Sequence, residues 1–126
     1  MKQIVSTKKA PAAIGPYSQA VIVNGIIYTS GVIPVNPETG QTVEGGIEEQ
    51  TRQVLMNLSK LLEASGAGMK DIVKTTVFIK NMDDFSKIND VYASFFSGDF
   101  PARSCIEAAR LPKDVWIEIE AIAVKA

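Results

Sequence analysis

The sequence predicts an α+β fold in which a single β-sheet carries two helices on one face. Two stretches place apolar residues every three or four positions, which is the period of an amphipathic helix. Six shorter stretches are rich in β-branched residues, and the chain order they give is β-ββ-α-β-α-ββ. Helices that alternate with strands in this way favour one sheet with the helices packed against it. The 126 residues suit one domain, so we expect a single domain spanning 1–126.

The first three predicted strands lie near the N-terminus. Lys2–Ser6 is expected to be a short edge strand. Thr7–Pro16 is expected to be irregular, because two prolines and a glycine interrupt any period. In Ala20–Gly31 the pair Asn24-Gly25 separates two apolar, β-branched runs, which is the strongest short-range signal for a β-hairpin.

The rest of the chain alternates helices and strands. Val32–Gly46 is expected to be a loop, because it contains two prolines and three glycines. Ile47–Ser65 predicts a helix, with acidic residues in the first turn that complement the helix dipole. Asp71–Lys80 predicts a strand. Asn81–Phe96 predicts a second amphipathic helix whose first residue can serve as N-cap, and Phe100–Glu120 supplies the last two strands.

The sheet face that points away from the helices is expected to need a cover as well. Its expected residues include Val73, Thr75, Val77, Ile117 and Ile119. They are too apolar to leave in water without an exposed patch of roughly several hundred Å². A homo-oligomer that packs sheet faces together would cover them, and a ligand site between subunits would follow.

Composition excludes several classes of function. The net charge of −1 leaves no excess of positive charge to hold a phosphate backbone, so no nucleic-acid partner is expected. A single cysteine rules out an intrachain disulfide. No apolar run reaches the roughly 18–20 residues of a membrane span, and the N-terminus lacks the apolar core of a signal peptide. We therefore expect a cytoplasmic protein with no membrane partner.

The chain contains no histidine. This removes the commonest base at neutral pH, every nucleophile that depends on a histidine, and most types of zinc site. Any catalysis must use arginine, lysine, carboxylates, tyrosine, cysteine, hydroxyls, backbone groups and water.

The stretch Phe100–Glu120 concentrates side chains suited to such chemistry. Successive side chains of a strand point to opposite faces, so Arg103 shares a face with Glu107, and Glu118 shares one with Glu120. If the two strands lie near each other, a guanidinium and a carboxylate face one space, where a small carboxylate-bearing molecule could bind. Taken alone, the pattern favours a structural salt bridge from Arg103 to Glu107 or Glu118, and it does not decide which glutamate would act.

Four further residues are weaker candidates. Cys105 lacks a histidine to activate it, so a small buried residue is the favoured interpretation, and its backbone amide can matter more than its sulfur. Tyr17 either places its hydroxyl over a pocket or packs under the N-terminal loop. Ser30 and Gly31 end a strand, where a glycine lets a ligand approach the backbone closely, although a plain turn would use the same residues.

Four segments together resemble the Rid family. They are Ala10–Gln19 (APAAIGPYSQ), Thr29–Pro37 (TSGVIPVNP), Asp71–Phe78 (DIVKTTVF) and Pro101–Val124 (PARSCIEAARLPKDVWIEIEAIAV). These proteins are reactive-intermediate (imine or enamine) deaminases, also called YjgF-like. The similarity is strongest to the RidA subgroup, whose arginine corresponds to Arg103.

The resemblance implies a chorismate-mutase-like α+β fold that forms a homotrimer. Three sheets would enclose a central β-barrel, with the helices outside and the sites between subunits. The implied reaction is hydrolysis of 2-iminobutanoate and 2-iminopropanoate to 2-keto acids and ammonia, with no metal and no cofactor. Dehydratases that use pyridoxal phosphate release these intermediates, and their removal protects other enzymes of that kind.

The resemblance also implies roles for residues of this chain. Arg103 would bind the substrate carboxylate, and Glu118 would hold and polarise the attacking water. The remaining cleft residues would be Tyr17, Ser30, Gly31, Asn89 and Cys105, of which Gly31 and Cys105 would contribute their backbone amides. Two alternatives stay open. One is a non-catalytic regulatory trimer that binds small acids, and the other, less favoured, is a ribonuclease or translation inhibitor.

Overall fold

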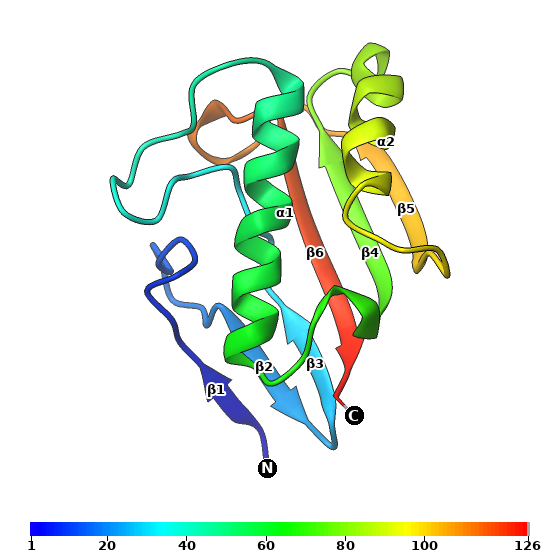
Figure 1. The fold of residues 1–126 in the computed structure, drawn as a ribbon. Helices are drawn as coiled ribbons and strands as arrows, with labels where there is room; N and C mark the ends of the chain where they lie inside the picture. The colour runs from blue at the N-terminus through cyan, green and yellow to red at the C-terminus, as the bar shows by residue number, and fades with distance from the viewer. Residues whose placement is uncertain (126) are drawn as a thin grey trace.

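A computed structural model describes residues 1–125 as one mixed six-stranded sheet with both helices on the same face (Figure 1). The strands are β1 (Gln3–Val5), β2 (Ala20–Val23), β3 (Ile26–Thr29), β4 (Ile72–Ile79), β5 (Ala102–Glu107) and β6 (Ile117–Val124). The helices are α1 (Ile47–Ala64) and α2 (Phe85–Ala93). The order across the sheet is β1-β2-β3-β6-β4-β5, so the predicted fold class and the edge position of β1 are confirmed.

The predicted hairpin joins β2 to β3 through Asn24 and Gly25. Their φ angles are +51° and +76°, which places both residues in the left-handed region that a two-residue hairpin turn requires. The register pairs Ile22 with Ile27, so the two buried side chains lie on the helix-covered face. The turn therefore fixes the register that keeps these two side chains on one face.

The two helices follow the predicted periodicity, with a difference at α2. α1 begins at Ile47 as expected and ends at Ala64. Asn81 acts as a cap, since its Oδ1 accepts a hydrogen bond from the Asp83 amide, but it caps a 3₁₀ turn (Met82–Asp84) and the α-helix starts only at Phe85. α2 also ends at Ala93, sooner than Phe96, so it is shorter than the pattern predicts.

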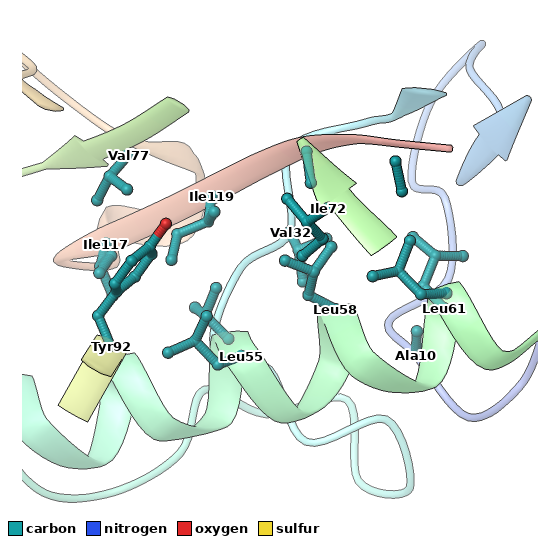
Figure 2. Close-up of a cluster of buried hydrophobic side chains, with 14 of the residues drawn as sticks. Ala10, Val32, Leu55, Leu58, Leu61, Ile72, Val77, Tyr92, Ile117 and Ile119 are labelled. Carbon is teal, nitrogen blue, oxygen red and sulfur yellow. The ribbon is translucent and has the colours of Figure 1, made fainter. Parts of the chain in front are cut away.

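The core lies between the helices and one face of the sheet. Figure 2 shows Leu55 and Leu58 of α1 and Tyr92 of α2 directed at Val77, Ile117 and Ile119 of the sheet. These sheet residues are fully buried, as is Thr75.

The expectation that Thr75, Val77, Ile117 and Ile119 line the uncovered face is therefore wrong. Only Val73 of that set is exposed. Alternation separates two sets of side chains in a strand but does not say which set the helices cover, and the more apolar set packs beneath them. The uncovered face instead holds Phe78, Glu118, Glu120 and Ile122, and beside them the exposed Tyr28.

Strand pairing at one end of the sheet differs from a simple hairpin succession. β5 runs parallel to β4 and is an edge strand, while β6 returns antiparallel between β3 and β4. The two strands that carry the candidate residues are thus not neighbours, because β4 separates them. No helix within residues 1–125 is long and apolar enough to cross a bilayer.

Candidate active site

Arg103 and Glu118 leave opposite faces of the sheet. Arg103 is opposite Thr75 in the β4–β5 ladder, and Thr75 is opposite Ala121 in the β4–β6 ladder, so all three point toward the helices. Glu118 is opposite Phe78 and points away from them. Within one chain, the expectation that a guanidinium and a carboxylate face one space is therefore wrong.

The salt bridges favoured by the pattern alone are absent too. Within the described residues the ion pairs are Lys60–Glu63 and Arg110–Asp114, both exposed. The Glu107 carboxylate instead accepts a hydrogen bond from the Met82 amide at 2.8 Å. Arg103 and Glu118 are thus available for other partners, in two separate half-sites.

The Glu118 half-site is formed by close approach of the backbone at Gly31. Val32 and Ile119 exchange two backbone hydrogen bonds, of 2.8 and 3.0 Å, which bring position 31 beside Glu118. A Cβ at Gly31 would overlap Glu118 Oε2 and lie 2.7 Å from its Cδ. In this position of the Glu118 side chain, only glycine at position 31 leaves room for the carboxylate.

The Glu118 carboxyl is electrostatically unusual. Its pKa is raised above its ordinary value, first because it is half-buried and then because the Glu120 carboxylate lies nearby. A carboxyl group that can be protonated closer to neutral pH suits a role in accepting and returning a proton. The structure thus distinguishes Glu118 from the exposed Glu120 by burial, as the resemblance also implies.

An open cleft of about 440 Å³ connects Glu118 with the other predicted residues of this half-site. It is lined by Tyr17, Ser30, Gly31, Glu118 and Glu120, together with Ile14, Ile33 and Pro112. The Tyr17 ring is about half exposed, and its hydroxyl oxygen accepts a hydrogen bond from the Ile14 amide at 3.3 Å. Ser30 Oγ donates to the Ser18 carbonyl at 2.6 Å. Tyr17 thus combines the two alternatives, because it lines the cleft and its hydroxyl also contacts the N-terminal segment.

The irregular N-terminal segment is held in place by a buried glutamine. Gln19 Nε2 donates to the carbonyls of Thr7 and Pro11, at 3.0 and 2.8 Å, and its Oε1 accepts from the Thr7 amide at 2.7 Å. A buried amide that satisfies several backbone groups acts in place of secondary structure. Gln19 therefore fixes the loop that carries Tyr17.

The Arg103 half-site lies between β5 and α2. Arg103 Nη1 donates to Asn89 Oδ1 at 2.7 Å. The guanidinium carbon lies 4.9 Å from the centre of the Tyr92 ring and 5.3 Å from that of Phe85. Asn89, which the resemblance to the Rid family implies as a cleft residue, is thus in direct contact with Arg103.

Cys105 lies two residues beyond Arg103 on the same edge strand. Burial raises the pKa of its thiol, and the nearby Arg103 charge opposes this only in part, so the thiol stays protonated at neutral pH. The Ala108 amide bonds to the Ile79 carbonyl, so by alternation the Cys105 amide points away from β4, toward the open edge. This orientation leaves the amide without a partner in the sheet, and its role in ligand binding stays a prediction.

Known proteins are similar to this chain over its whole length. The profile of the family described as Endoribonuclease L-PSP matches residues 7–125. A 2-iminobutanoate/2-iminopropanoate deaminase of Escherichia coli is 54% identical over 128 residues, covering 99% of each chain. A solved Rid family protein of unknown function from Yersinia pestis has a TM-score of 0.96 at 54% identity, covering 98% of this chain and 99% of its own. The chain belongs to the Rid family.

Other relatives of this Rid protein carry different names. A RutC family protein of Pyrococcus horikoshii is 51% identical over 125 residues, which is 99% of each chain. The E. coli protein TdcF, solved with bound serine, is 46% identical with a TM-score of 0.94, covering 98% of this chain and 99% of its own. Family membership alone thus leaves more than one activity open, and the choice depends on the residues of the site.

Two residues that matter in this Rid protein were not singled out from its sequence, namely Gln19 and Tyr92. Phe85, Asn89 and Tyr92 are spaced four and three residues apart, so they share one stripe of α2. A polar asparagine between two aromatic residues on an apolar stripe was the available signal. Gln19 gave none, because its partners are backbone groups of an irregular segment.

Within residues 1–125, no three His, Cys, Asp or Glu side chains are grouped to hold a metal.

Proposed function

We propose that this Rid protein hydrolyses 2-imino acids, with their enamine tautomers, to 2-keto acids and ammonia. The observation that carries the proposal is the half-buried Glu118 carboxyl, whose pKa is raised and which lies against the Gly31 backbone in an open cleft. The relatives named 2-iminobutanoate/2-iminopropanoate deaminase support the same substrate class. Such a carboxyl can act as base and then as acid without a histidine.

The chemistry requires only water and one carboxyl group. Water adds to the electrophilic iminium carbon, and its proton passes to Glu118, which gives a neutral carbinolamine. Glu118 then protonates the nitrogen, the C–N bond breaks, and the hydroxyl oxygen becomes the ketone. The hydroxyl proton ends on the departing ammonia as ammonium, so one water is consumed and the atoms balance. The reaction in water is already fairly fast, so positioning supplies most of the acceleration needed.

Arg103 supplies the affinity for the substrate carboxylate. A guanidinium binds a carboxylate through two parallel hydrogen bonds, and the outward amide of Cys105 adds a third donor at the same edge. Because Arg103 and Glu118 leave opposite faces of one sheet, a molecule as small as an imino acid cannot reach both in one chain.

We therefore propose a site between subunits, with Arg103 of one subunit facing Glu118 of the next. The Rid resemblance supports a homotrimer. The exposed apolar residues Tyr28, Ile106 and Val124 on the sheet side of the molecule support packing of sheets against one another. The full site would then also contain Tyr17, Ser30, Gly31 and Asn89.

The proposal places this protein in the cytoplasm, beside the pyridoxal-phosphate dehydratases that release imino acids. The substrate's own iminium group supplies the electrophile, so we propose that the reaction needs neither metal nor cofactor. A non-catalytic role in binding small acids is the second candidate, favoured by the relative solved with serine. The absence of histidine and the net charge of −1 weigh against ribonuclease activity.

A coupled assay tests the activity. A dehydratase generates 2-iminobutanoate in situ, and the decay of the imine is followed with and without this protein. We expect faster decay with the wild type, no acceleration with Arg103→Ala, and a weakened effect with Glu118→Ala. Glu107→Ala, a carboxylate on the edge strand that bonds the Met82 amide, is the matched control and should keep its rate. Wild type that binds 2-oxobutanoate but leaves imine decay unchanged would support the second candidate instead.

Mixing an Arg103 variant with a Glu118 variant tests whether the site spans subunits. Arg103→Ala and Glu118→Gln are unfolded together, refolded together, and assayed. In a mixed cyclic oligomer, about a quarter of the interfaces join an intact Arg103 to an intact Glu118, so about a quarter of wild-type activity should return. Arg103→Ala refolded alone should stay inactive, and Glu118→Gln refolded alone should keep only its own weakened rate. No recovery in oligomers shown to be mixed would overturn the proposal that Arg103 and Glu118 act together across a subunit boundary.

A further inference from the structure

The Arg103 guanidinium is held by side chains of α2, namely Phe85, Asn89 and Tyr92, which we call the arginine seat. Three contacts to the guanidinium come from one stripe of α2: the Asn89 amide oxygen at 2.7 Å and the rings of Tyr92 and Phe85. Arg103 itself is half-buried on the edge strand β5. An arginine on an open edge would otherwise sample many rotamers, so contacts on its faces restrict it.

The Tyr92 ring is fixed in turn by a buried hydrogen bond. Its hydroxyl and Thr75 Oγ1 lie 2.7 Å apart, Thr75 is fully buried, and Tyr92 is 4% exposed. Thr75 is also the residue of β4 directly opposite Arg103 in the strand register. The chain of contacts from Arg103 through Tyr92 therefore ends at Thr75, which is the residue paired with Arg103 in the sheet. Burial raises the pKa of the Tyr92 hydroxyl, so it remains a neutral hydrogen-bonding group.

The seat leaves one edge of the guanidinium open. Within residues 1–125 the hydrogen bonds of the guanidinium engage Nη1 alone. The rings lie within cation–π distance and add attraction to the cation without using its N–H groups. Nε and Nη2, which form the side-on edge that matches the two oxygens of a carboxylate, stay available.

We propose that Tyr92, Thr75 and Phe85 are positioning residues that hold Arg103 with its Nε–Nη2 edge presented to the carboxylate of a 2-oxo or 2-imino acid. This inference rests on the proposed function of Arg103 in carboxylate binding. The seat acts before any chemistry, so it governs affinity for the carboxylate. Proton transfer at Glu118 does not depend on it, because Glu118 leaves the opposite face of the sheet.

Binding of 2-oxobutanoate, measured by calorimetry, is the first readout. Tyr92→Leu removes the ring, and we expect Kd and KM to rise about ten-fold while kcat stays within about two-fold. Tyr92→Phe and Thr75→Val keep the ring and remove only the hydrogen bond, so each should raise Kd about two- to three-fold. Phe85→Leu should fall between them. Phe96→Leu is the matched control: its ring packs 5.0 Å from that of Tyr92, and the aromatic contacts of Arg103 are to Phe85 and Tyr92.

A double-mutant cycle separates positioning from a structural role. In an Arg103→Lys background the planar cation is gone, so adding Tyr92→Leu should change Kd little further. An equal fold-change in both backgrounds, or a loss in Phe96→Leu as large as in Tyr92→Leu, would overturn the proposal. If Tyr92→Leu does not fold, Tyr92→Phe and Thr75→Val carry the test, and unchanged Kd in both would overturn it too.

The outcomes distinguish this inference from the proposed function. Wild type that binds 2-oxobutanoate through Arg103 without accelerating imine decay would end the deaminase proposal and leave the seat standing. Wild type that accelerates imine decay, with a Kd for 2-oxobutanoate that Tyr92→Leu does not change, would support the deaminase proposal and overturn the seat. Wild type that neither binds 2-oxobutanoate nor accelerates imine decay would overturn both.

Discussion

The two half-sites of this protein are organised by different physical means. Around Arg103, side chains from a helix grip the charged group from the side and from its faces. Around Glu118 the backbone forms the site, because a glycine lets the main chain approach the carboxylate. Burial and a second carboxylate then raise the pKa of Glu118. The cation is held in a fixed orientation and the carboxyl is tuned in pKa. This difference suits binding at one end of a substrate and proton transfer at the other.

The largest expected effect is at the backbone-built half. Gly31→Ala would push a Cβ into the Glu118 carboxyl group, which must then move. A displacement of about 1 Å can reduce a rate about 100-fold, so we expect kcat in the imine assay to fall by up to that factor, and by no more than in Glu118→Ala. Binding of 2-oxobutanoate through Arg103 should weaken far less.

The matched control for this change is Gly68→Ala. A Cβ at Gly68 meets nothing within 4 Å, and its backbone is extended, so activity should be retained. A Gly31→Ala variant as active as Gly68→Ala would show that the position of Glu118 does not matter.

A smaller effect is expected on the pH dependence of stability. The folded state binds the Glu118 proton more tightly than the unfolded state, so stability falls as pH rises from the ordinary value of 4.5 through the raised folded pKa. Glu118→Gln lacks this loss. Its thermal midpoint should therefore exceed that of the wild type at pH 7 by more than at pH 4.

Thermal unfolding at the two pH values measures this difference, with Glu120→Gln alongside. Removing the Glu120 charge should lower the Glu118 pKa and give a smaller gain in the same direction. A midpoint difference that is the same at pH 4 and pH 7 would contradict the assignment of a raised Glu118 pKa.

The smallest effect is expected at Cys105, in the half organised by side chains. Its thiol is protonated at neutral pH and its proposed contribution is a backbone amide, which Cys105→Ala retains. Activity should stay within about two-fold of the wild type, and iodoacetamide should label the wild-type thiol slowly at pH 7. A ten-fold or greater loss of activity in Cys105→Ala would show that the sulfur takes part in binding or in the reaction.

The sequence was sufficient for the element order, the hairpin and α1, because each rests on local periodicity or turn chemistry. It was not sufficient for the placement of Arg103 relative to Glu118. Their separation depends on β6 returning between β3 and β4 and on β5 pairing in parallel, both of which are long-range choices with no local signal. The wrong face assigned to Thr75 and Val77 has another cause, because alternation along a strand does not say which set of side chains the helices cover.

The candidate residues themselves were found mainly by resemblance to the Rid family, since spacing alone favoured a salt bridge for Arg103. What the sequence could not give was the supporting contacts. Tyr92 looks like any core aromatic residue until its hydroxyl is seen on Thr75 and its ring beside the guanidinium. Gln19 looks like a surface residue until its backbone partners are known.

The close packing of Gly31 on Glu118 also constrains how sequences of this kind can diverge. Any side chain at position 31 competes for the space that the Glu118 carboxyl occupies, so the two positions cannot change independently. A relative with a larger residue at the position of Gly31 should carry a shorter or uncharged residue at that of Glu118.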